Sequence, residues 1–246
     1  MSTVADTNRC FYDALWRDAR LQAPERFNTW PLVSRQHPGG RPSLELGPGL
    51  RPRLPLDGTV FVEASRPAAA KLRARGAQAF AGDARDLPFG DAAFGMVAAF
   101  DIIEHVDDDD GALSEISRVA MPGAALLLSA PLHPSYWTPF DDMVGHRRRY
   151  EPERLIAKLT EHGLVVERSA VYGMKPKSSA LVDLGMWLLE HRRERAMWWY
   201  RSVIMPLALR FQKKLTLCPG MIPTEQVDAV LLVCRKPYAV RGAGSA

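Results

Sequence analysis

Short apolar runs alternate with helical patterns through the middle of the chain, and this alternation constrains the fold more than any other feature. The apolar runs lie at 43–46, 59–62, 77–81, 96–100 and 125–129. Helical spacing separates them at 66–75, where Gly76 ends it, and at 109–119, where Pro122 and Gly123 end it. Continuously apolar strands joined by helices favour a mostly parallel sheet with both faces covered.

The C-terminal half adds one helical pattern and two more strand-like runs. Helical spacing at 151–162 stops at Gly163, and strand-like runs follow at 165–166 and 227–234. The segment 174–221, which lies between those two strands, mixes apolar helical spacing with arginines, tryptophans and a tyrosine. We therefore expect this segment to be a helical insertion.

Composition places the chain among ordinary globular proteins. With 246 residues, 47% of them hydrophobic, it is long enough for one large domain or a domain with an appended part. A formal charge of +4 is too small to argue for nucleic acid by itself.

Three cysteines without a CxxC pair argue against a disulfide framework or a zinc site and fit a reducing cytoplasm. The polar start does not resemble a secretory signal, and no apolar run reaches the roughly 18 residues that span a bilayer.

A glycine-rich turn, Leu-Glu-Leu-Gly-Pro-Gly at 44–49, directly follows the first strand. Glycines at the carboxyl end of a parallel strand let a ligand approach the backbone. A dinucleotide site would need a third glycine where this chain has Pro52, which has no N–H to offer a phosphate. Glu45 would repel an anion but suits an ammonium group, and Glu63 after the next strand can bind a ribose diol. These residues predict a site for an adenosine with a cationic tail, which describes S-adenosylmethionine.

Five ordered blocks, at 44–49, 62–65, 82–89, 100–106 and 119–123, carry a resemblance to a known family. In their order and spacing the chain resembles class I S-adenosylmethionine-dependent methyltransferases, in particular the small-molecule and ubiquinone-biosynthesis-like branch. The resemblance implies an α/β, Rossmann-like fold with a seven-stranded, mostly parallel sheet, helices on both faces and an antiparallel last strand. It also implies an N-terminal helical lid (1–40), a methyltransferase core (41–173 and 222–238) and an insertion at 174–221 that serves as a lid or a dimer face.

The resemblance further implies which residues contact S-adenosylmethionine and its product S-adenosylhomocysteine. Glu45 is implied to order the methionine part, Glu63 to bind the ribose, and Asp83 to lie near the adenine amino group. The full set lies on the turn and at the ends of the next strands: Glu45, Gly47, Gly49, Glu63, Ala64, Asp83, Ala84, Phe100, Asp101 and His105. The chain departs from the family at 50–55, where we expect a short or displaced helix.

Residues for the methyl acceptor are expected beyond the fourth and fifth strands. The candidate bases are His133, His146 and Asp101, although both histidines could be structural and Asp101 could start a helix. Candidate substrate residues could stack on a flat acceptor or simply pack on the sheet: Tyr12, Trp16, His133, Tyr136, Trp137 and Tyr172. No metal site is predicted, because the four adjacent acids at 107–110 cannot converge on an ion without a special loop.

Three functions stay open on the sequence alone. The first is methylation, preferably on nitrogen, of a small flat heteroaromatic metabolite; with its start at 11–32, the chain resembles the azapteridine N-methyltransferases of bacterial toxoflavin biosynthesis. The second is O- or C-methylation of a phenolic, quinone or lipid acceptor at a membrane surface, through the cationic and aromatic stretch 192–214. The third is a non-catalytic donor-binding or regulatory protein, or an RNA-binding relative. We expect a small-molecule partner, no nucleic acid, a cytoplasmic location, and a monomer or homodimer.

Overall fold

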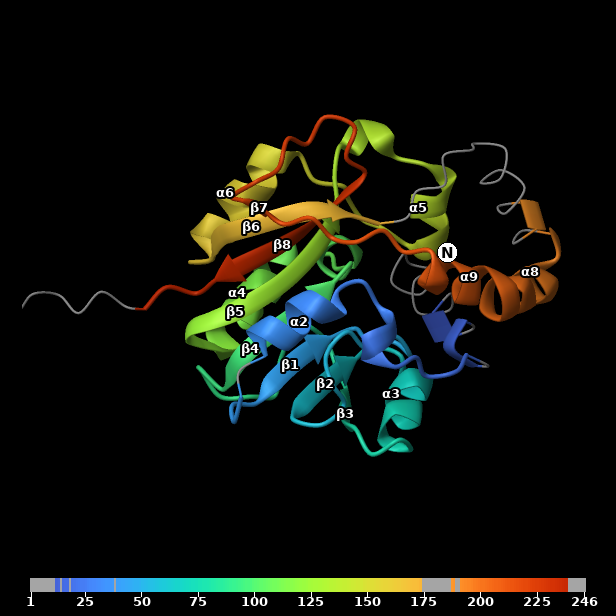
Figure 1. Cartoon of the computed structure of the whole chain (residues 1–246), viewed down its shortest axis with the longest axis horizontal. Helices are drawn as coiled ribbons and strands as arrows, with labels where there is room; N and C mark the ends of the chain where they lie inside the picture. Colours follow the sequence, from blue (N-terminus) through green and yellow to red (C-terminus); the bar gives the residue numbers. More distant parts are fainter. Residues whose placement is uncertain are drawn as a thin grey trace, which may run out of the picture.

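The computed structural model describes residues 12–13, 15–17, 19–37, 39–173, 187–188 and 191–238. One mixed sheet runs through its centre in the order β3-β2-β1-β4-β5-β8-β6-β7 (Figure 1). The strands are β1 (Ser43–Leu46), β2 (Thr59–Glu63), β3 (Gln78–Ala81), β4 (Phe94–Phe100), β5 (Ala120–Pro131), β6 (Val165–Tyr172), β7 (Cys218–Pro219) and β8 (Ala229–Arg235). The predicted Rossmann-like α/β fold is therefore confirmed.

Strand directions follow the prediction closely. Strand β1 pairs in parallel with β2 and β4, β2 with β3, and β4 with β5. Strand β8 runs antiparallel to both β5 and β6, as expected for the last strand. Over the described residues the sheet has eight strands and not seven, because Cys218 and Pro219 pair with Ser169 and Arg168 at the edge. A two-residue strand leaves no periodic pattern in a sequence.

Helices flank the sheet, and polar side chains fix where several of them begin. The α-helices are α2 (Trp30–Gln36), α3 (Arg66–Arg73), α4 (Asp109–Val119), α5 (Pro139–Val144), α6 (Pro152–Glu161), α8 (Arg193–Trp199) and α9 (Met205–Arg210). Shorter turns are η1 (Pro24–Arg26), η2 (Ile103–His105), η3 (Pro134–Tyr136) and the π-helical η4 (Tyr200–Ile204). The Asp108 carboxylate caps α4 by accepting from Gly111 N at 2.8 Å. None of the described helices is long and apolar enough for a membrane crossing.

The core lies on both faces of the sheet, because successive strand side chains point to opposite sides. On β5, Leu126 and Leu128 join the cluster that packs under α4 and α6, whereas Leu127 joins the cluster on the opposite face. That opposite cluster includes Leu32 and Val33 of α2, which lies across the sheet in Figure 1. Helix α2 falls inside the predicted 1–40 lid, yet it packs on the sheet.

Candidate functional site

A cavity of about 950 Å³ opens where β1, β2, β3 and β4 end. In open parallel sheets this carboxyl edge is where ligands bind. The wall contains most of the predicted donor residues: Glu45, Gly47, Glu63, Ala64, Asp83, Ala84, Phe100, Asp101 and His105. The structure thus brings together side chains from four separate stretches of sequence. Gly49 does not line the cavity and lies directly behind it.

The turn after β1 requires glycine at two positions. Gly47 and Gly49 have φ angles of 59° and 54°, in the left-handed region that favours glycine. A Cβ at Gly47 would overlap the Ile102 side chain, and one at Gly49 would overlap the Trp16 ring. Glycine therefore allows the left-handed backbone of this turn and the close packing of the Ile102 and Trp16 side chains against it. A residue with a Cβ would disturb both.

Glu45 organises the segment that follows the turn. Its buried carboxylate accepts from the backbone N–H of Arg53 at 2.9 and 3.0 Å and from that of Leu54 at 2.9 Å. Burial raises the pKa of Glu45 to about 7. The sequence predicted a short or displaced helix here, but the structure shows no helix between β1 and β2, because Pro52 and Pro55 cannot donate helical hydrogen bonds.

Glu63 ties the end of β2 to the glycine turn. One carboxylate oxygen accepts from Gly49 N at 2.7 Å, and the other accepts from Ser65 N at 2.8 Å. Burial raises the pKa of Glu63 above its ordinary value. Because each carboxylate oxygen has two lone pairs, each retains one for a ligand hydroxyl.

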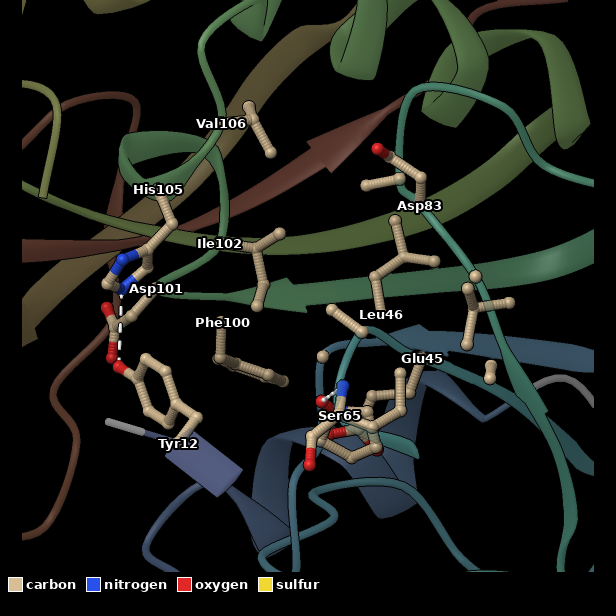
Figure 2. A pocket seen from close by; sticks show the side chains of 18 of the residues that line it. Tyr12, Glu45, Leu46, Ser65, Asp83, Phe100, Asp101, Ile102, His105 and Val106 are labelled. Atoms are coloured by element: carbon tan, nitrogen blue, oxygen red, sulfur yellow. Dashed lines mark hydrogen bonds between the residues drawn. The ribbon is translucent and has the colours of Figure 1, made fainter. Parts of the chain in front are cut away.

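The cavity has two chemically different ends, which lie apart in Figure 2. At one end Asp83 forms an ion pair with Arg85 at 2.6 Å, and this pairing lowers the pKa of Asp83. At the other end the Tyr12 hydroxyl lies 3.3 Å from His105 Nε2, with Asp101 beside them. Burial lowers the pKa of His105 to about 3, so this imidazole is neutral.

Asp101 takes a strained position at the end of β4. Its φ of 54° is uncommon outside glycine. Its N–H donates to Ser129 Oγ at 2.9 Å, and the Ser129 hydroxyl donates back to its carboxylate at 2.6 Å. The carboxylate lines the cavity, and the surrounding protein raises the pKa of Asp101. Of the three candidate bases, only Asp101 lies in the cavity wall.

His133, Tyr136 and Trp137 do not line this cavity, and their role toward the acceptor stays a prediction. His133 Nε2 donates to the Thr224 carbonyl at 2.8 Å, and Trp137 Nε1 donates to Asp142 at 3.1 Å. The loop after β5 turns away because its backbone is tied elsewhere: Leu132 N donates to Asp228 O, and His133 N donates to Tyr150 O.

His146 and Tyr172 lie behind the wall of the cavity. His146 Nδ1 donates to Asp141 at 2.7 Å, and the ring centre lies 4.6 Å from that of His105. The Tyr172 ring centre is 6.1 Å from that of Phe100. Neither residue belongs to the cavity lining, so both support residues that do. Tyr12 and Trp16, in contrast, line the cavity, and their contact with a substrate stays a prediction.

Comparisons with known proteins bear on this site. Residues 56–128 match the family profile described as a methyltransferase domain. Over 60 residues the chain is 43% identical to the demethylmenaquinone methyltransferase of Streptomyces avermitilis, and over 52 residues 40% identical to the norajmaline N-methyltransferase of Rauvolfia serpentina. A SAM-dependent methyltransferase from Thermotoga maritima has the same fold, with a TM-score of 0.60 at 17% identity over 93% of this chain and 99% of that chain.

Residues 56–128 therefore carry the sequence pattern of a methyltransferase domain, and the chain has the fold of the Thermotoga maritima protein. The aligned segments cover 24% and 21% of this chain, and 26% and 18% of the two curated relatives. The chain therefore spans about a quarter or less of the length of the curated relatives it matches.

The size and the acidic residues of the cavity suit a cationic nucleoside. The cavity volume lies within the range of small-molecule sites, roughly 300–1,000 Å³. Two buried carboxylates, Glu45 and Glu63, line the part that the glycine turn forms. Because buried acids disfavour an anionic ligand and attract a cation, this wall fits a sulfonium nucleoside with an ammonium group better than a diphosphate.

Two arginines in the cavity wall follow from no motif in the sequence. Arg51 and Arg53 line the cavity. The Arg51 guanidinium lies 5.1 Å from the Trp16 ring centre, and that of Arg53 lies 3.7 Å from the Phe27 ring centre. The only sequence signal was the departure from the family at 50–55, which marked the segment without indicating where its side chains go.

The described part of the predicted insertion packs beside the cavity. The Tyr200 hydroxyl of η4 accepts from Arg51 at 3.1 Å. The Gln212 side-chain oxygen accepts from Asn28 N at 3.0 Å, so this segment also contacts the N-terminal region. Figure 1 shows α8 and α9 at the same end of the molecule as the first described residues, 12–13 and 15–17. Its use as a lid or a dimer face stays a prediction.

Proposed function

We propose that this chain transfers the methyl group of S-adenosylmethionine to a small, flat acceptor that lies in the same cavity. The observation that carries the proposal is the composition of the cavity. Carboxylates line its donor side, and aromatic rings from Tyr12, Trp16 and Phe100 line it as well. Aromatic side chains favour planar ligands because they stack on them or meet them edge to face.

In this proposal each end of the cavity has its own task. Glu45 attracts the ammonium group of the donor, Glu63 accepts from the ribose hydroxyls, and Asp83 lies beside the adenine. The donor supplies a methyl group activated by the sulfonium. The protein aligns the acceptor for in-line attack and excludes water, and alignment of this kind can account for a large share of the rate.

Nitrogen is the favoured acceptor atom. A heteroaromatic nitrogen of low pKa has a free lone pair at neutral pH and needs no base, and the low pKa of His105 makes this imidazole a weak base. The local similarity to norajmaline N-methyltransferase supports nitrogen chemistry. Among flat heteroaromatic acceptors, a demethylated azapteridine of the toxoflavin type is the specific candidate that the sequence suggests.

The proposal is tested by incubating the full chain with S-adenosylmethionine and a panel of acceptors. The panel contains a demethylated azapteridine, other flat nitrogen heterocycles, phenols and quinols, and mass spectrometry identifies the methylated atom. We expect N-methylated product from at least one heterocycle at micromolar enzyme. Product from the phenols or quinols alone would contradict N-methylation, and no product from any acceptor would contradict the enzyme activity.

A second candidate is O- or C-methylation of a phenolic, quinone or lipid acceptor at a membrane surface. Large apolar side chains are exposed on α8, η4 and α9 and directly after α9: Trp198, Trp199, Ile204, Leu207 and Phe211. Such residues beside cations are typical of interfacial helices, and the local similarity to demethylmenaquinone methyltransferase supports a quinone. Co-sedimentation with anionic vesicles distinguishes the two: binding favours this candidate, and no binding favours a metabolite in solution.

A further inference from the structure

Three side chains capable of binding a metal meet behind the acceptor end of the cavity. Glu104 and His105 belong to η2, which follows β4, and His146 follows α5 along the chain. One ligand atom from each lies within 4.8 Å of the other two. His105 also lines the cavity, so the cluster borders the space that we assign to the acceptor.

The Glu104 carboxylate is the unusual member of this cluster. The side chain is fully buried, and neither of its oxygens has a hydrogen-bond partner. Buried polar groups are nearly always paired, and an unpaired buried carboxylate costs free energy. The nearby Arg149 does not pair with it, because its guanidinium binds Asp141 and Asp228. The arrangement leaves two carboxylate oxygens available to a cation.

The contacts of both histidines suit the tautomer in which Nε2 can bind a metal. His105 Nδ1 donates to the Gly145 carbonyl at 3.4 Å, and His146 Nδ1 donates to the Asp141 carboxylate at 2.7 Å. With the proton on Nδ1, the lone pair lies on Nε2. Histidines that bind metals usually donate their other N–H to a carboxylate or a backbone carbonyl in this way. The Tyr12 hydroxyl contacts His105 Nε2 at 3.3 Å and would give way to an ion.

We propose that Glu104, His105 and His146 bind one divalent transition-metal cation, with Zn²⁺, Mn²⁺ and Co²⁺ as the fitting class. Two imidazoles and one carboxylate favour these ions over Mg²⁺ or Ca²⁺, which prefer oxygen ligands. Ligand bonds of about 2.0–2.2 Å require only small side-chain movements from the present spacing. Three protein ligands leave a coordination position for a further molecule.

Ion binding itself does not depend on methyl transfer. A use of the ion to hold an acceptor oxygen or nitrogen at the His105 end of the cavity rests on the proposed function. A chain that binds the ion but methylates nothing would support this site and contradict the proposed function. A chain that methylates an acceptor but binds no ion would support the proposed function and contradict this metal site.

The test is a titration of the chelator-treated full chain with Co²⁺, followed by visible absorption, with Zn²⁺ as a competitor. We expect one saturable equivalent whose d–d bands disappear when Zn²⁺ is added. Glu104→Gln and His146→Gln should each weaken binding at least tenfold, and His162→Gln should not. His162 is the matched control because its ring pairs with Asp110, outside the cluster.

The absence of a saturable equivalent in the wild-type chain would overturn the proposal. Equal weakening by His162→Gln, or no weakening by His146→Gln, would overturn it as well. X-ray absorption of the wild-type Zn²⁺ complex keeps the test decisive if the variants fail to fold. Two imidazole ligands and no sulfur are expected, and sulfur ligation or a different number of imidazoles would refute this ligand set.

Discussion

Individual carboxylates determine what the donor side of the cavity can bind. Glu63 accepts one N–H on each oxygen, from Gly49 and from Ser65, which fixes its orientation toward the cavity. Donor residues could be predicted from sequence because the ends of parallel strands share one edge of the sheet. The path of the loop after β5 could not, because His133 is held by Thr224, which lies far along the chain.

Replacing Glu63 tests its assigned contact with the ribose. Glu63→Ala should weaken binding of S-adenosylhomocysteine by about 1–3 kcal/mol, because hydrogen bonds to a charged group are lost. Isothermal titration calorimetry measures the change. Glu167→Ala is the control, since Glu167 pairs with Arg235 and does not line the cavity. Unchanged affinity in Glu63→Ala would refute the ribose contact.

Glu45 makes the stability of the fold depend on pH. Burial raises the pKa of Glu45 to about 7, so the folded chain holds a proton at pH values where the unfolded chain has lost it. The contribution of Glu45 to stability should therefore decrease as the pH rises from about 5 to 7, by roughly 1–3 kcal/mol. Urea unfolding of the wild type and Glu45→Gln at several pH values measures the difference between them. A difference that is flat, or that grows with pH in favour of the wild type, would contradict this assignment.

Most strands could be predicted from the sequence, but the packing of the helices and the edge strand could be predicted only in part. Strands β1, β2 and β4 are buried and mostly apolar, so their positions follow from the local sequence. The packing of α2 on the sheet depends on contacts with Met96 and Leu127, which no local pattern contains. The two-residue β7 forms only because β6 offers an edge.

The glycine turn after β1 has a conformation that substitution should disturb. Gly47→Ala combines a positive φ with overlap on Ile102, so we expect a loss of stability of about 1–3 kcal/mol together with weaker donor binding. Gly58→Ala is the matched control, because Gly58 has a φ of 72° but open space around it. Thermal unfolding compares the two variants. Equal losses of stability in the two variants would contradict an effect of the Ile102 overlap at Gly47.

Helix α5 and the segment that follows it are anchored by a buried ion pair. Asp141 accepts from Arg149 at 2.9 and 3.1 Å and from His146 at 2.7 Å. Asp141→Ala leaves Arg149 buried without this partner and should cost about 3–5 kcal/mol of unfolding free energy. Chemical denaturation measures it against Asp142→Ala, which removes an exposed neighbour. A loss below about 1 kcal/mol would contradict the anchoring role.

The whole molecule combines a predictable scaffold with a substrate side that the sequence did not determine. Four acids lie near the carboxyl edge of the sheet. Glu45 and Glu63 lie on the side that we assign to the donor, and Asp101 and Glu104 lie toward the side that we propose for the acceptor. No sequence pattern connects these acids with one another, and only the fold shows that His146 and Glu104 meet. Which acceptor enters therefore depends on residues brought together by tertiary structure.

The central claim is that the turn after β1 receives a positively charged sulfur nucleoside. Calorimetric titration of the full chain with S-adenosylmethionine, S-adenosylhomocysteine, NAD and ATP tests it directly. We predict micromolar binding of the first two and no measurable binding of NAD or ATP. Tight binding of NAD or ATP, with no response to the methyl donor or its product, would contradict the account.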